Sequence, residues 1–128
     1  MRDFMIQLIA SDIDGTLLNN KMQISKFNSY AIKKAQQGVH FIISSGRLYS
    51  EVKPLLDEVG LKCPLISING GLILSADNEV LAPYPLHQAT VNKLMKCLKK
   101  HHLYFEVITK KTFFQMIKLN ELKTLHSY

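Results

Sequence analysis

The sequence predicts an α/β fold in which a parallel sheet is covered by helices. Three apolar runs, at residues 5–11, 39–44 and 64–69, have the length and composition of buried strands. Two stretches with helical periodicity separate them, one at residues 26–37 and one that ends near residue 59. Strand, helix, strand, helix, strand with short links is typical of parallel strands joined by right-handed crossovers.

Residues with known positional preferences mark the ends of both helices. Ser25 is a favoured N-cap for the first helix, and Gly38 follows its last turn. Gly60 ends the second helix, which Pro54 either starts or kinks. The apolar stripe predicted for the first helix consists of Phe27, Tyr30, Ala31 and Ala35.

The pattern changes after the third strand. Residues 72–74 and 79–81 are apolar runs on either side of a polar turn, which predicts a β-hairpin. Two prolines follow the hairpin. We therefore divide the chain into a core segment, residues 1–82, and a smaller α+β segment, residues 83–128.

The smaller segment predicts a helix at residues 88–100, a strand at 104–109 and a further helix at 112–128. It also carries the excess of positive charge, because Lys and Arg equal Asp and Glu in number up to residue 92 and the formal net charge is +6. A basic patch can bind nucleic acid or steer anionic substrates. Lysines at helical spacing are at least as typical of a solvated helix face, so we do not expect a nucleic-acid partner.

The composition is that of a globular protein. It argues against a membrane protein and against a disulfide-rich or zinc-binding protein. No apolar run approaches the roughly 20 residues needed to cross a bilayer, so we expect no membrane partner and a cytoplasmic location. Cys63 and Cys97 lie far apart without Cys or His at metal-ligand spacing. Neither a disulfide framework nor a zinc site is therefore indicated.

Two carboxylates stand at the end of the first predicted strand. Asp12 follows the apolar run and Asp14 follows at the alternate position, before Gly15 and Thr16. The carboxyl edge of a parallel sheet is where open α/β folds bind ligands. Two carboxylates so close repel each other unless a cation lies between them or one holds a proton, so the pair suits a Mg²⁺ ligand, a nucleophile or a general acid. Gly15 allows a sharp turn, and Thr16 offers a hydroxyl and an amide to an anion.

Three segments resemble motifs of the haloacid dehalogenase-like phosphohydrolases. Residues 12–18, Asp-Ile-Asp-Gly-Thr-Leu-Leu, resemble the first motif of that superfamily. Residues 41–47, which end in Ser-Ser-Gly-Arg, resemble the second, and residues 65–71, which end in Asn-Gly-Gly, resemble the third-strand loop of the Cof-type branch. The resemblance implies a Rossmann-like parallel sheet with helices on both faces, followed by the start of an α+β cap.

The resemblance also implies catalytic roles. Asp12 would be the nucleophile that forms an aspartyl phosphate, and Asp14 would protonate the leaving group and later activate water. Mg²⁺ would be held by the Asp12 carboxylate and the Asp14 backbone carbonyl. In the family, a second half of the chain brings a lysine and an acidic Gly-Asp loop. This sequence contains no Gly-Asp dipeptide, and no glycine follows Gly71.

The second and third motifs would bind the substrate, although each residue has a structural alternative. Ser45 would donate its hydroxyl and amide to a phosphoryl oxygen, or serve as an N-cap. Gly46 allows close approach. Arg47 pairs with a carboxylate, steers substrate, or is an exposed arginine at a helix start. Asn69 and Gly70 line the substrate side of the site, or only form a tight turn.

The leading functional hypothesis is a Mg²⁺-dependent phosphatase of small phosphorylated metabolites, such as sugar phosphates, that is incomplete in this chain. The alternatives are a phosphotransferase of the sugar phosphomutase type and a truncated, non-catalytic remnant that binds anions or a partner chain. In the family the first strand is central. Here it should form an edge, open either to a second copy or to a missing C-terminal half.

Overall fold

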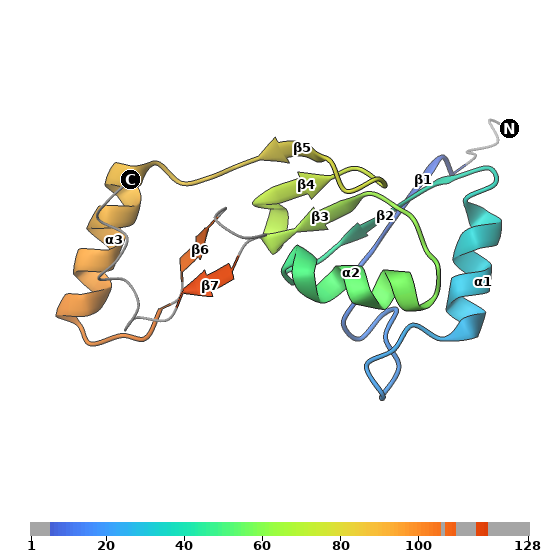
Figure 1. Ribbon diagram of the computed structural model, residues 1–128, viewed down its shortest axis with the longest axis horizontal. Coiled ribbons are helices and arrows are strands. Elements are labelled where there is room, and N and C mark those ends of the chain that lie inside the picture. Colours follow the sequence, from blue (N-terminus) through green and yellow to red (C-terminus); the bar gives the residue numbers. More distant parts are fainter. Residues whose placement is uncertain (1–5, 106, 110–114, 118–128) are drawn as a thin grey trace, which may run out of the picture. The chain divides into compact units, whose positions relative to one another are not determined.

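A computed structural model describes residues 6–105, 107–109 and 115–117. The chain divides into two compact units, Met1–Tyr84 and Pro85–Tyr128 (Figure 1). The assignment of the second unit to the start of a cap stays a prediction.

The first unit contains a mixed sheet of five strands in the order β1-β2-β3-β4-β5. Its elements are β1 (Leu8–Ser11), α1 (Lys26–Ala35), β2 (His40–Ser44), α2 (Tyr49–Glu58), β3 (Leu65–Ser67), the 3-10 helix η1 (Ile68–Gly70), β4 (Leu72–Leu74) and β5 (Val80–Pro83). The first three strands are parallel, whereas β4 and β5 are antiparallel to their neighbours. The predicted α/β class, the three parallel strands and the hairpin are therefore confirmed.

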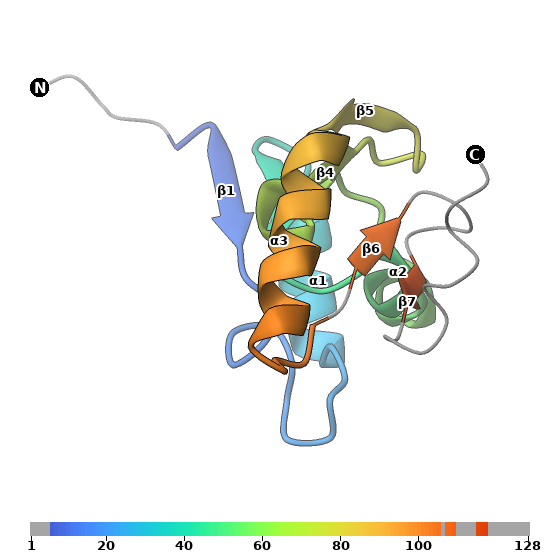
Figure 2. The ribbon, with the colours of Figure 1, turned by 90° about the vertical axis from the view of Figure 1, so that its left-hand side faces the viewer.

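Both crossover helices lie on the same side of the strands (Figure 1), and Figure 2 shows α1 and α2 both to the right of β1. Hydrogen bonds join them, because the Ser29 hydroxyl and the Lys33 ammonium of α1 donate to the Val59 carbonyl at the end of α2, at 3.3 and 2.6 Å. Right-handed crossovers between strands that follow one another across the sheet place successive helices on one face. The expected helices on both faces are thus found on one face in the part of the first unit that is described.

The core lies between this face of the sheet and the two helices. Its buried apolar side chains from the strands and helices are Ile32, Phe41, Ile43, Val52, Leu56, Leu65, Leu72 and Leu74. The stripe predicted for α1 is wrong, because Phe27 and Tyr30 are 77% and 65% exposed while Ser29 and Ile32 are buried. Periodicity alone did not distinguish two overlapping stripes, and the sheet selected the one that contains Ile32.

The opposite face of the sheet carries a row of small and apolar side chains. Ala10 pairs with Ile42, and Ile66 pairs with Ile73, which in turn pairs with Ala82. The three isoleucines are only partly buried. We refer to these five residues as the open face.

Strand β1 forms an edge of the sheet within the described residues, as expected for this chain. The prediction of a buried first strand is wrong here, since Leu8 is 53% exposed and Ile6, just before the strand, is 69% exposed. Leu8 lies on the face opposite the helices, like its exposed partner His40, and a strand is fully buried only when both faces of its sheet are covered.

The second unit contains α3 (Gln88–Lys100), as predicted, and an antiparallel pair of strands, β6 (Val107–Thr109) and β7 (Gln115–Ile117). Strand β6 confirms the last part of the strand predicted at residues 104–109. The helix predicted at residues 112–128 is wrong over β7, and its other residues lie outside the described part. Short apolar runs fit both periods, and here pairing with β6 favours the strand. No described helix is long and apolar enough to span a membrane.

Candidate active site

The turn after β1 is closed around a single carbonyl group. The Ile13 carbonyl accepts hydrogen bonds from the amides of Leu17 and Leu18, at 2.9 and 3.1 Å, and the Thr16 amide lies at 3.4 Å from it. The Ile13 side chain is fully buried. The turn is thus anchored in the core, while its polar side chains point outward.

Both acidic side chains of this turn are exposed. The Asp12 carboxylate accepts a hydrogen bond from the Ile13 amide at 2.7 Å through Oδ1. Gly15 has a φ of +70°, the left-handed conformation that glycine adopts without strain. The predicted need for glycine at this position is confirmed, because it turns the chain directly after Asp14.

Ser45 and Arg47 form the second turn, directly after β2. Ser45 is buried, its amide donates to the Ile66 carbonyl at 2.9 Å, and its hydroxyl accepts from the Arg47 amide at 3.1 Å. It is not the N-cap of α2, because Leu48 holds that position and the Glu51 carboxylate accepts from the Leu48 amide at 2.8 Å. The Ser45 hydroxyl stabilises the turn itself.

The third turn, after β3, clamps the second turn through its backbone. The Arg47 carbonyl accepts from the Ser67 hydroxyl at 2.7 Å and from the Ile68 amide at 3.2 Å. The Asn69 amide donates to the Ser45 carbonyl at 3.3 Å. Ser67 is fully buried, and sequence reasoning missed its part in the site. The available signal was its position as a hydroxyl residue that closes a strand, like Ser44 before Ser45.

Asn69 and Gly70 complete this third turn with left-handed backbone conformations, at φ values of 51° and 91°. The Asn69 side chain packs over Gly46, where a Cβ atom would lie 2.9 Å from Asn69 Oδ1. Gly46 therefore does allow another group to approach the backbone closely, and in this structure that group is the Asn69 side chain. The tight turn expected of Asn-Gly is also present.

Arg47 joins the second turn to the first. Its Nε donates to Asp14 Oδ2 at 2.8 Å and its Nη2 donates to Asp14 Oδ1 at 2.6 Å, a bidentate pair. The side chains of Arg47 and Asp14 are 25% and 48% exposed. The hydrogen bonds from Arg47 lower the pKa of Asp14 below its usual value, so this carboxyl group is ionised at neutral pH. Of the three roles considered for Arg47, the structure shows pairing with a carboxylate, that of Asp14.

All three turns lie at the carboxyl edge of the parallel strands. The register pairs Ser11, next to Asp12, with Ile43, two residues before Ser45. These segments therefore meet at one edge, as expected for segments that each end a strand of one parallel sheet. The two described pockets are lined by residues other than those of these turns.

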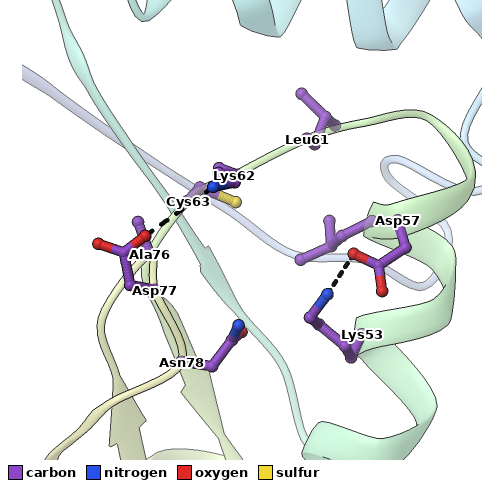
Figure 3. Close-up of a pocket in the computed structure, with 9 residues that line it drawn as sticks. Lys53, Asp57, Leu61, Lys62, Cys63, Ala76, Asp77 and Asn78 are labelled. Carbon is purple, nitrogen blue, oxygen red and sulfur yellow. Dashed lines mark hydrogen bonds and ion pairs between the residues drawn. The ribbon is translucent and has the colours of Figure 1, made fainter.

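One of these pockets lies at the other end of the strands, before the start of β3, between the end of α2 and the β4–β5 turn (Figure 3). Lys53 pairs with Asp57 on one wall, and Lys62 lies 4.0 Å from Asp77 across it. Cys63, also in the wall, is buried. The charges of this pocket are thus paired within it.

The donor groups at the first turn fit Mg²⁺ in part. Mg²⁺ binds one or two carboxylates and fills its remaining positions with water and substrate phosphate. Asp12 offers a carboxylate, and Asp14 offers its backbone carbonyl while its side chain is held by Arg47. No group of three or more His, Cys, Asp or Glu side chains that could hold a metal occurs among the described residues.

Comparisons with known proteins identify the family and the fold of this chain. Residues 9–127 match the model of a family described as haloacid dehalogenase-like hydrolase. The chain is 32% identical over 105 residues to phosphatase YwpJ of Bacillus subtilis, which is 81% of this chain and 37% of that protein. It is 36% identical over 105 residues to 5-amino-6-(5-phospho-D-ribitylamino)uracil phosphatase YwtE of the same species, which is 81% of this chain and 36% of that protein.

Two solved structures show the same fold. One is a haloacid dehalogenase-like hydrolase from B. subtilis, with a TM-score of 0.74 at 32% identity over 80% of this chain and 36% of that chain. The other is the phosphatase BT1666 from Bacteroides thetaiotaomicron, with a TM-score of 0.75 at 23% identity over 93% of this chain and 44% of that chain, a likeness of fold alone. The chain thus spans less than half the length of these relatives. It belongs to the haloacid dehalogenase-like hydrolase family.

Proposed function

We propose that this chain carries the nucleophile and the phosphate-binding turns of a Mg²⁺-dependent phosphatase of small phosphorylated metabolites. The observation that carries the proposal is the pairing of Asp14 with Arg47, which brings an acidic turn and a Ser-Gly-Arg turn together at one sheet edge. The named phosphatases among its relatives support the reaction class.

Asp12 is the better placed of the two carboxylates to attack phosphorus. Its Oδ1 is fixed by the Ile13 amide, and its side chain is exposed beside the turn. Attack would form an aspartyl phosphate and release the alcohol of the substrate. Asp14, protonated after it separates from Arg47, would give its proton to the ester oxygen as that oxygen leaves phosphorus, and its carboxylate would later take a proton from water. Mg²⁺, when bound at Asp12 and the Asp14 carbonyl, would offset the charge that gathers as one anion approaches another.

The second and third turns would hold the phosphate group. Arg47 offers a planar fork of donors that matches phosphate oxygens. Ser45 is held rigidly by the Ile66 and Arg47 backbones, so its hydroxyl has a fixed position from which to donate. Asn69 would face the substrate from above Gly46, the glycine over which it packs.

Beryllium fluoride, which mimics a phosphoryl group on an aspartate, tests this proposal without requiring turnover. With Mg²⁺, the chain should form a bound fluoride species visible by ¹⁹F NMR, and Asp12→Asn should abolish it because an amide cannot replace the nucleophile. Asp14→Asn is the matched control and should retain the adduct. An adduct that survives Asp12→Asn, or no adduct in either parent or control, would contradict the proposal.

A non-catalytic remnant is the second candidate, favoured by the absence of the lysine and acidic motifs of the family from this sequence. The match covers 37% of the length of YwpJ and 36% of the length of YwtE. The described residues contain no cluster of three or more His, Cys, Asp or Glu side chains that could hold a metal ion. We accordingly expect the chain by itself to hydrolyse p-nitrophenyl phosphate near background. Robust hydrolysis that Asp12→Asn abolishes would exclude the remnant.

We further propose that polypeptide corresponding to the rest of these relatives covers the β1 edge and the open face. The proposal rests on the exposed Ile6 and Leu8, the unpaired side of β1 within the described residues, and the more than half of each relative that has no counterpart here. Apolar edges of this kind otherwise pair with another copy of the chain.

A further inference from the structure

Arg47 already holds an anion that belongs to the protein. Asp14 takes the edge of the guanidinium formed by Nε and Nη2, at 2.8 and 2.6 Å. A bidentate phosphate takes an edge of the same geometry, because two parallel N–H donors match two oxygens of either anion. Asp14 therefore occupies a position at which phosphate would bind.

The two ends of Arg47 differ in how firmly they are held. Its carbonyl accepts hydrogen bonds from Ser67 and Ile68, and its amide donates to Ser45, so the backbone is fixed from both sides. Its side chain is 25% exposed and that of Asp14 is 48% exposed. Ion pairs this open to water favour the paired state by factors of up to about five. An incoming anion can therefore displace Asp14 while the backbone stays in place.

We propose that Asp14 and the phosphate group of the substrate compete for Arg47, so that the Asp14–Arg47 pair is a latch that phosphate opens. This inference rests on the proposed function, since it takes the ligand to be a phosphate oxyanion. Phosphate on Arg47 frees the Asp14 carboxylate beside Asp12, where the leaving group and water would need it. A ligand without phosphate leaves the latch closed.

Titration of the chain with inorganic phosphate tests the latch, at constant ionic strength and without Mg²⁺. The Nε–Hε resonance of Arg47 in NMR spectra reports directly on the partner of the guanidinium. Asp14→Asn removes the competing charge and should tighten phosphate binding by up to about fivefold, because apparent affinity falls with the fraction of Arg47 that is engaged elsewhere. Arg47→Gln should abolish the binding.

Asp12→Asn is the matched control, because it removes one negative charge from the same turn. In the parent chain the Asp12 carboxylate accepts a hydrogen bond from the Ile13 amide and none from Arg47. It should tighten binding less than Asp14→Asn. Equal effects of the two substitutions would overturn the latch and leave the phosphatase proposal standing. Phosphate binding that survives Arg47→Gln would also overturn the latch. No phosphate binding by the chain or any variant would overturn both.

Discussion

Replacing Ser67 by alanine should destabilise the candidate site through one hydrogen bond. The Ser67 hydroxyl is fully buried and donates to the Arg47 carbonyl at 2.7 Å, a good distance for an O–H donor. Such a bond contributes about 1 kcal/mol net. The carbonyl keeps its second donor, the Ile68 amide at 3.2 Å, so no buried acceptor is left unpaired. We therefore expect Ser67→Ala to lower the free energy of unfolding by about 1 kcal/mol and no more.

Urea denaturation followed by circular dichroism measures this loss as a lower midpoint with an unchanged slope. Ser44→Ala is the matched control, because Ser44 ends the neighbouring strand but is exposed, and surface substitutions usually change stability by less than about 0.5 kcal/mol. If Ser67→Ala is as mild as Ser44→Ala, the clamp on Arg47 adds no stability. A loss above about 3 kcal/mol would also refute the reasoning, since it would require an unpaired group.

Two further predictions concern the edge strand and the buried thiol. In hydrogen exchange, the amides of Leu8 and Ala10, which point away from β2, should exchange fast in a monomer and slowly only when the chain self-associates or binds more polypeptide; slow exchange in a monodisperse monomer would mean that the chain covers its own edge. Burial raises the pKa of the Cys63 thiol to about 11, so at pH 8 iodoacetamide should modify the exposed Cys97 and spare Cys63, which should react faster as the pH rises toward 11. Equal modification of both thiols in the folded chain would be the contrary result.

The sheet and the meeting of the site segments were predictable because local signals and a general rule were enough. Apolar runs between helix caps gave the three parallel strands, and parallel strands share one carboxyl edge. Ser25 caps α1 as expected, since its hydroxyl accepts from the Asn28 amide at 3.0 Å. The individual strands and the cap of α1 depend mainly on residues that are close to one another in the sequence.

Features that depend on distant neighbours were missed or left open. Arg47 had three possible roles, and only the fold shows that the carboxylate of Asp14 is within reach. The part played by Ser67 depends on a carbonyl 20 residues away. The exposure of Phe27 follows from which face of α1 the sheet covers, and β7 exists because β6 is available to pair with it.

The hydrogen bonds at the site divide it into two bodies. The second and third turns are joined by backbone bonds at Ser45, Arg47 and Asn69, so they move together. Among the described residues, the hydrogen bonds between the first turn and these two turns are those of Asp14 with Arg47. The anion recognition and the chemistry at Asp12 that we propose are thus linked through one partly exposed ion pair. Such a link can respond to a ligand without any change in the sheet, because only two side chains need to move.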